Sequence, residues 1–159
     1  MSGVPYVATL SAALGCGLVA GVLFAFSSFV MPALGRLPHA EGVAAMQSIN
    51  RLAVTPAFMT ALFGTGVLCL GLIVWAVASF DGWSSALMLV GGALYVLGAI
   101  GVTILFNVPL NDALAKVHPG SADAAVLWAT YLTNWTAWNH ARTITALAAA
   151  ALLILSLRV

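Results

Sequence analysis

Charged side chains are scarce in this sequence. Of its 159 residues, five are Lys or Arg and four are Asp or Glu, so 6% of the chain is charged while 63% is hydrophobic. Soluble globular domains carry about a quarter charged residues, and this composition excludes that class. The formal net charge of +1 provides no basic surface for nucleic acid. The composition therefore indicates a single integral membrane domain covering residues 1–159.

Cysteine and catalytic motifs are equally sparse. Cys16 and Cys69 both lie inside apolar runs, which predicts small buried side chains that can be neighbours in the bilayer, and no disulfide framework. The sequence lacks a P-loop, a Gly-x-Ser-x-Gly motif and paired carboxylates, which argues against kinase, hydrolase and glycosidase chemistry. All four acidic residues lie outside the long apolar runs, which argues against a proton-coupled transporter or an ion channel.

Long runs without charge divide the chain into membrane-spanning segments. Residues 1–35, 52–80 and 82–111 contain no Asp, Glu, Lys, Arg or His, and each run exceeds the roughly 20 residues that a helix needs to cross a bilayer. A shorter run at 143–157 must include the turns before it. We therefore predict an all-α fold, a four-transmembrane-helix bundle with helices near 5–34, 56–80, 84–108 and 122–157.

Short signals between these runs support the boundaries. Thr55 and Pro56 resemble an N-cap followed by proline at the first helical position. Asp81-Gly82 predicts a tight turn between the second and third helices. The segment His39 to Arg51 predicts a short amphipathic helix at the membrane interface, between the first and second spans.

The few basic residues predict an orientation. Arg36, Arg51 and Lys116 lie in the loops after the first and third helices, and Arg142 is nearer that side, whereas Arg158 is alone on the other. The positive-inside rule therefore predicts that these two loops are cytoplasmic and that both termini lie outside. We expect the membrane to be a bacterial inner membrane.

Polar side chains gather in the membrane half next to those two loops. Polar groups at membrane depth are expensive and usually line a site, which predicts a cavity that opens toward the cytoplasm. The alternative is an ordinary interfacial belt of amides and tryptophans. The residues concerned are Gln47, Asn50, Arg51, Thr55, Asn107, Asn111, Asp112, Asn134, Asn139, His140 and Arg142.

The fourth predicted helix carries an aromatic stripe. At 100° per residue, six side chains fall within about 100° of one another. This face predicts a slot for a flat aromatic ligand with Arg142 facing an oxyanion, and the alternative is helix packing with an interfacial belt. His140 points about 120° or more away from most of the stripe. The stripe consists of Trp128, Tyr131, Trp135, Trp138, Asn139 and Arg142.

A metal site is not indicated by the spacing of the histidines. His39 and His118 lie beside prolines in loops, and both would have to fold back onto His140 to complete a three-histidine set. No HExxH, CxxC or His-x-x-His spacing supports this arrangement. We therefore expect no metal ligands, with a metal- or haem-carrying redox protein kept as an alternative.

Four segments carry a family resemblance. Residues 21–34 (GVLFAFSSFVMPAL), 45–50 (AMQSIN), 103–111 (TILFNVPLN) and 135–143 (WTAWNHART) resemble the four-helix membrane family of anthrone oxygenase-like proteins. The resemblance covers nearly the whole chain. It implies oxidation of an anthrone methylene to the anthraquinone carbonyl by dioxygen, without an organic cofactor.

This chemistry assigns expected roles to the polar residues. It needs a base, an oxyanion stabiliser and a dry pocket. We expect His140 to act as base and Arg142, Asn107 and Asn139 to stabilise the anion. The substrate-binding residues would be Tyr131, Trp135, Trp138, Gln47, Asn50 and Asn111.

The expected partners are a hydrophobic aromatic small molecule, dioxygen and the lipid bilayer. Glycine-rich helix faces also permit a homo-oligomer. A second alternative is a non-enzymatic membrane assembly protein. That alternative predicts polar groups paired with one another and no cavity among the second, third and fourth helices.

Overall fold

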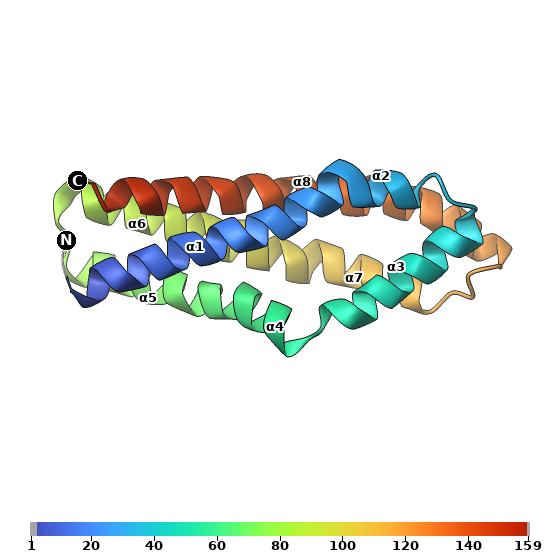
Figure 1. The fold of residues 1–159 in the computed structure, drawn as a ribbon, viewed down its shortest axis with the longest axis horizontal. Helices are drawn as coiled ribbons and strands as arrows, with labels where there is room; N and C mark the ends of the chain where they lie inside the picture. Colours follow the sequence, from blue (N-terminus) through green and yellow to red (C-terminus); the bar gives the residue numbers. More distant parts are fainter. Residues whose placement is uncertain (1–2, 159) are drawn as a thin grey trace.

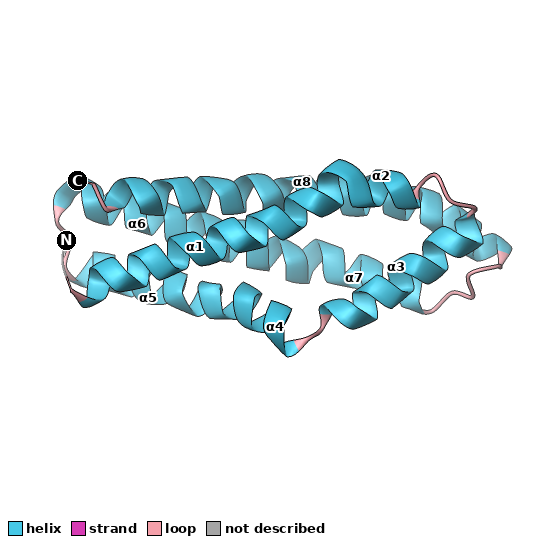
Figure 2. Cartoon of the chain, in the orientation of Figure 1, coloured by secondary structure: helices cyan, strands magenta, loops and turns pink. Residues whose placement is uncertain are grey.

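The protein is described by a computed structural model that covers residues 3–158, and every regular element in that range is helical (Figure 2). The all-α prediction is confirmed. The α-helices are α1 (Val4–Ala25), α2 (Met31–Leu34), α3 (His39–Ala53), α4 (Pro56–Met59), α5 (Thr65–Ala78), α6 (Gly82–Ala93), α7 (Val108–Ala115) and α8 (Ala122–Ser156). Wider π-helical turns join several of them, at Phe26–Val30, Thr60–Gly64, Leu94–Gly101 and Thr103–Asn107.

Because the π-helical turns continue the helices they join, the elements form four long apolar helices. These are Val4–Leu34, Pro56–Ala78, Gly82–Ala115 and Ala122–Ser156, with 31, 23, 34 and 35 residues. Each is long and apolar enough to cross a membrane, which confirms the predicted bundle and makes the chain an integral membrane protein. Both ends of the chain lie at the same end of the bundle (Figure 1).

The third helix extends beyond its predicted end. The sequence predicts an end near residue 108, just before Pro109, but the helix continues to Ala115. The π-helical turn Thr103–Asn107 ends just before this proline, which lies in the first turn of α7. A wider turn relieves the clash of the proline ring with the preceding carbonyl, and a proline in a first turn loses no required donor. The other predicted ends agree within two residues.

A first core fills the half of the bundle that carries the termini. Small residues of α1, α5 and α8 make up much of it and let the helix backbones approach closely, and Met88 of α6 and Tyr95 pack among them. Cys16 and Cys69 are both fully buried there, with their sulfur atoms 3.9 Å apart and unoxidised. The expectation of two small buried neighbours is confirmed. One tight approach involves Gly98, where an added Cβ would lie 2.5 Å from the Cβ of Thr145.

A second core extends the bundle beyond the start of α4. Helix α8 alone is about 52 Å long at the usual helical rise, whereas the hydrocarbon core of a bilayer is about 30 Å thick. Helices α2, α3, α7 and the first turns of α8 form this extension at the end opposite the termini (Figure 1). The short helix predicted between the first and second spans is therefore present as α3 (His39–Ala53). Figure 1 shows it inclined along the bundle, where Val43 and Met46 are buried.

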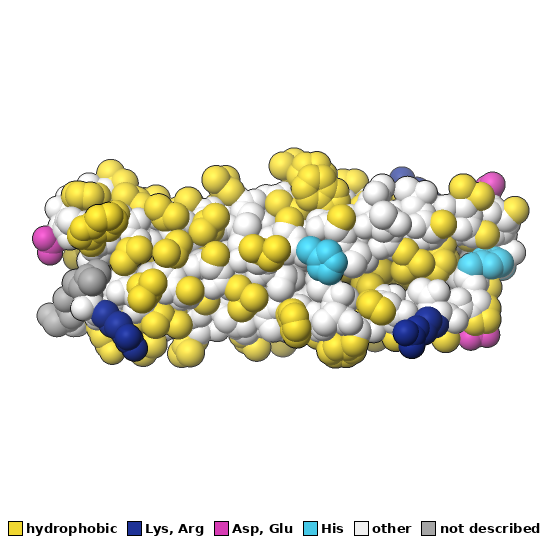
Figure 3. Space-filling view, turned by 90° about the horizontal axis from the view of Figure 1, so that it is seen from above, with side chains coloured by type: hydrophobic (Ala, Val, Ile, Leu, Met, Phe, Trp, Pro, Cys, Tyr) yellow, Lys and Arg dark blue, Asp and Glu magenta, His cyan; other side chains and the backbone are white. Residues whose placement is uncertain are grey.

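The outer surface matches a membrane environment. In Figure 3 the charged side chains on the visible face lie towards the two ends of the molecule, with hydrophobic side chains between them. Many large apolar side chains along the bundle are exposed, such as Leu18, Val67 and Leu97. A continuous apolar band of this kind is expected to face lipid.

Candidate functional site

A cavity of about 210 Å³ lies between the two cores. Apolar protein cavities of about 150 Å³ bind benzene, so this one has room for an aromatic ring. We call it the Arg142 cavity. Its lining is largely apolar and consists of Val22, Leu23, Phe26, Met46, Ile49, Asn50, Ala53, Val54, Phe58, Met59, Leu62, Phe63, Thr103, Ile104, Val108, Asn111, Trp135 and Arg142.

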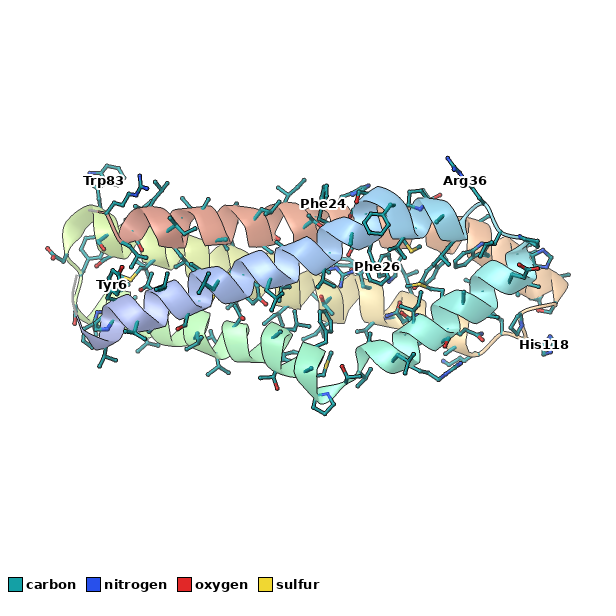
Figure 4. The ribbon with its side chains drawn as sticks, viewed as in Figure 1. Tyr6, Phe24, Phe26, Arg36, Trp83 and His118 are labelled. Carbon is teal, nitrogen blue, oxygen red and sulfur yellow. The ribbon has the colours of Figure 1, made fainter. Side chains whose placement is uncertain are left out.

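The mouth of the Arg142 cavity opens on the outer surface of the bundle. Val54, at the corner between α3 and α4, is 70% exposed, and Ile104 on the facing helix is 52% exposed. The corner follows from Thr55-Pro56, since a residue before proline avoids helical geometry and Thr55 is extended. On the long helix Val4–Leu34, Phe26 lines the cavity, whereas Phe24 is exposed on the outer side of the helix (Figure 4).

Arg142 provides the only charge among the described residues that line this cavity. Its side chain is 6% exposed, and its guanidinium donates to Thr103 Oγ1 at 3.1 Å and to Asn139 Oδ1 at 2.6 Å. It also lies 5.1 Å from the centre of the Trp135 ring. Within the described chain, Arg142 Nε has no hydrogen-bond partner. A buried cation with neutral partners is costly unless an anion completes its environment.

Asn139 holds this guanidinium in place. Its Nδ2 donates to the Leu23 carbonyl and to Ser27 Oγ, both at 2.7 Å, so its oxygen is directed at Arg142. Asn139 is fully buried behind the lining of the cavity. The amide therefore positions the guanidinium and does not itself reach the cavity.

A second set of polar groups lines the cavity beside Trp135. The indole Nε1 of Trp135 donates to Asn111 Oδ1 at 2.8 Å, and the Tyr131 hydroxyl donates to the same oxygen at 2.7 Å. Asn50 Nδ2 lies 3.4 Å from that hydroxyl. The Tyr131 and Trp135 rings are stacked, with centroids 6.1 Å apart. These contacts join α3, α7 and α8 at one site.

The structure thus brings six of the ten predicted site residues together. Arg142, Trp135, Asn50 and Asn111 line the cavity, and Tyr131 and Asn139 are hydrogen-bonded directly to members of that set. The helical periodicity of α8 explains the placement of the four that it carries, because the inward face repeats every three or four residues.

Three other predicted residues have structural contacts outside the cavity. Gln47 donates to the Leu114 and Val117 carbonyls, which are free acceptors at the end of α7. Asn107 donates to the Trp135 carbonyl at 3.1 Å. Trp138, at the edge of the predicted stripe, stacks on Phe106 with ring centroids 3.8 Å apart and is 36% exposed.

His140 also lies outside the cavity, and the geometry does not bring the expected base to the site. Its side chain is exposed, because it follows the inward-facing Asn139 by about 100° around α8. His118 lies at the far end of the extension (Figure 4). Over residues 3–158, no three His, Cys, Asp or Glu side chains come close enough to hold a metal ion.

The variant His140→Ala tests this placement. We expect its affinity for an aromatic ligand of the cavity to stay within about twofold of the wild type, because surface substitutions of this kind usually change free energies by no more than about 0.5 kcal/mol. Titration of 1-naphthol into the protein in lipid nanodiscs measures the affinity. A tenfold loss of affinity for 1-naphthol would show that His140 contributes to the site.

Several cavity residues were not predicted from the sequence. Thr103 accepts a hydrogen bond from Arg142, and it precedes Asn107 by four residues, a spacing that usually places two side chains on one helix face. Phe58, Leu62 and Phe63 form one wall. No sequence signal distinguishes these apolar side chains from neighbours that face lipid.

The fold and the site together define a class. This is a four-helix integral membrane protein with an apolar cavity whose inner end carries a buried cation. The family model described as anthrone oxygenase matches residues 55–152, and the chain belongs to the anthrone oxygenase family. It is therefore an oxygenase-like membrane protein. No curated protein and no solved structure matches the chain.

Proposed function

We propose that this protein takes a planar phenolic molecule from the bilayer into the Arg142 cavity and oxidises it with dioxygen. The observation that carries the proposal is the buried Arg142 guanidinium, with neutral partners and a free Nε, in an otherwise apolar cavity. An oxygen anion on a flat ring satisfies both features, since the ring fills the apolar part and the anion completes the environment of the cation.

The depth of Arg142 supports a ligand that arrives through lipid. It lies about 21 Å along α8 from Ser156, at the usual helical rise, which is within the thickness of the hydrocarbon core. The mouth lies beside Val54 and Ile104, both exposed and apolar. An apolar ring that partitions into the membrane therefore meets the mouth without passing through water.

The oxidation balances with dioxygen alone. A methylene conjugated to the ring loses a proton, and the resulting enolate gives its electrons to dioxygen and forms a carbon–oxygen bond. The peroxide takes up the proton, and loss of water then breaks the oxygen–oxygen bond and the second carbon–hydrogen bond to leave a carbonyl. One oxygen atom enters the product and the other leaves as water.

In this scheme Arg142 stabilises the negative oxygen of the enolate, and Asn139 and Thr103 hold its guanidinium in position. None of the described residues that line the cavity is acidic, a histidine or a cysteine. The proton of the methylene therefore passes to water and not to a side chain of this lining, and Arg142 stabilises the anion that remains. The assembly-protein alternative predicts no cavity at this position, and the Arg142 cavity favours the oxygenase.

Anthrone supplied with ¹⁸O₂ to the protein in lipid nanodiscs tests the proposal. The expected product is anthraquinone with one labelled oxygen, formed at least about tenfold faster than in empty nanodiscs, since stabilising one oxyanion contributes a factor of about 10² or more. The matched control is the same measurement with Arg142→Met. If the wild type is no faster than empty nanodiscs, the protein does not oxidise anthrone.

A further inference from the structure

Trp135 fixes which groups donate and which accept in the series of hydrogen bonds that it forms with Asn111, Tyr131 and Asn50. An indole N–H can only donate, so the atom of Asn111 that lies 2.8 Å from Trp135 Nε1 must be its oxygen. The Tyr131 hydroxyl, 2.7 Å from the same oxygen, must donate as well. The phenolic oxygen is then left as an acceptor, and the group of Asn50 that faces it is the amide nitrogen.

This order leaves two polar groups of opposite character without protein partners. Asn111 Nδ2 is a donor and Asn50 Oδ1 is an acceptor, and both residues line the Arg142 cavity. Across residues 3–158 neither atom has a hydrogen-bond partner in the protein. A donor and an acceptor at one place match a hydroxyl group, which accepts one hydrogen bond and donates another.

We propose that Asn111 and Asn50 form a second oxygen subsite that recognises a neutral hydroxyl on the ring whose other oxygen is bound by Arg142. The ligand class is thus a planar aromatic molecule with at least two oxygen substituents. Tyr131 is a positioning residue in this subsite, because it acts through both amides and does not itself line the cavity. The inference rests on the proposed placement of an oxygen anion at Arg142.

Binding of naphthols to the protein in nanodiscs tests the subsite without requiring turnover. The probes are 1-naphthol, with one oxygen, and a panel of dihydroxynaphthalene isomers. At least one isomer is expected to bind about tenfold more tightly than 1-naphthol, because each hydrogen bond that would otherwise stay unmade is worth about a factor of ten. Its substitution pattern then gives the separation of the two subsites.

Two variants separate recognition from packing. Asn111→Leu removes the donor, and Tyr131→Phe removes the hydroxyl that orients both amides. In each we expect the preferred isomer to lose its advantage while the affinity for 1-naphthol stays within about threefold, because the ring and the Arg142 contact are unchanged. The matched controls are Tyr95→Phe, at a buried tyrosine that donates to the Leu62 carbonyl, and Asn134→Leu, at an exposed asparagine. Both controls should keep the advantage.

The outcomes distinguish the two proposals. If no isomer binds more tightly than 1-naphthol, or if the advantage survives in both Asn111→Leu and Tyr131→Phe, the second subsite is overturned. If 1-naphthol binds equally well to wild type and Arg142→Met, the oxyanion site itself fails. The test of the second subsite compares two affinities within one protein, so a general loss of stability in a variant does not mimic its result.

Discussion

Replacing Arg142 by methionine is expected to abolish most ligand affinity without unfolding the protein. Hydrogen bonds to a charged group contribute about 1.5–3 kcal/mol, which corresponds to a loss of roughly 10- to 150-fold in the affinity for a naphtholate. Removing a buried cation whose partners are all neutral also removes its desolvation cost, which offsets the hydrogen bond that Asn139 Oδ1 loses. The expected signature is therefore weaker binding together with an unchanged or higher Tm in detergent.

Arg51→Met is the matched control, because Arg51 is exposed near the end of α3. It should change neither affinity nor Tm. A large fall in Tm for Arg142→Met would show that the guanidinium mainly ties α8 to the third helix through Thr103. An unchanged ligand affinity in Arg142→Met would show that Arg142 does not bind the ligand.

The largest expected loss of stability follows from Gly98→Leu. A Cβ at this position would lie 2.5 to 2.6 Å from three side-chain atoms of Thr145, and β-branched threonine has little rotameric freedom in a helix. The two helices must separate, and overpacking of this kind typically costs 1–3 kcal/mol, with larger values for more added atoms. A cost of about 3 kcal/mol lowers Tm by roughly 6–12 °C in a chain of this size.

Gly21→Leu is the control for this prediction, since a Cβ on Gly21 meets nothing within 4 Å. Its Tm should stay close to that of the wild type. Equal losses at the two positions would show that helix packing in the membrane core is looser than the Gly98–Thr145 contact indicates.

The sequence predicted the features that depend on one helix at a time. Charge-free runs identified three spans, and a shorter run with the turns before it identified the fourth, because crossing a bilayer requires length and low charge and little else. Periodicity along the fourth helix correctly placed Tyr131, Trp135, Asn139 and Arg142 on one buried face. The same 100° step placed His140 away from most of that face, yet residue type alone made it the expected base.

Features that depend on several helices could not be predicted in this way. The wall formed by Phe58, Leu62 and Phe63 consists of apolar residues that are indistinguishable in sequence from those facing lipid. The continuation of the third helix through Pro109 requires a π-helical turn, for which the sequence carries no local signal. Gln47 and Asn107 have the residue types of a binding site, but their amide nitrogens donate to the backbone carbonyls of Leu114 and Trp135.

The unequal lengths of the four spans connect the cavity to the thickness of the membrane. The second span begins at Pro56, beside the mouth, while the other three continue past it into the extension. The acyl chain length of the surrounding lipid therefore decides what the mouth meets. Long chains submerge the α3–α4 corner in hydrocarbon, and short chains leave it among headgroups and water. Access to the Arg142 cavity is in this sense a property shared between the protein and its bilayer.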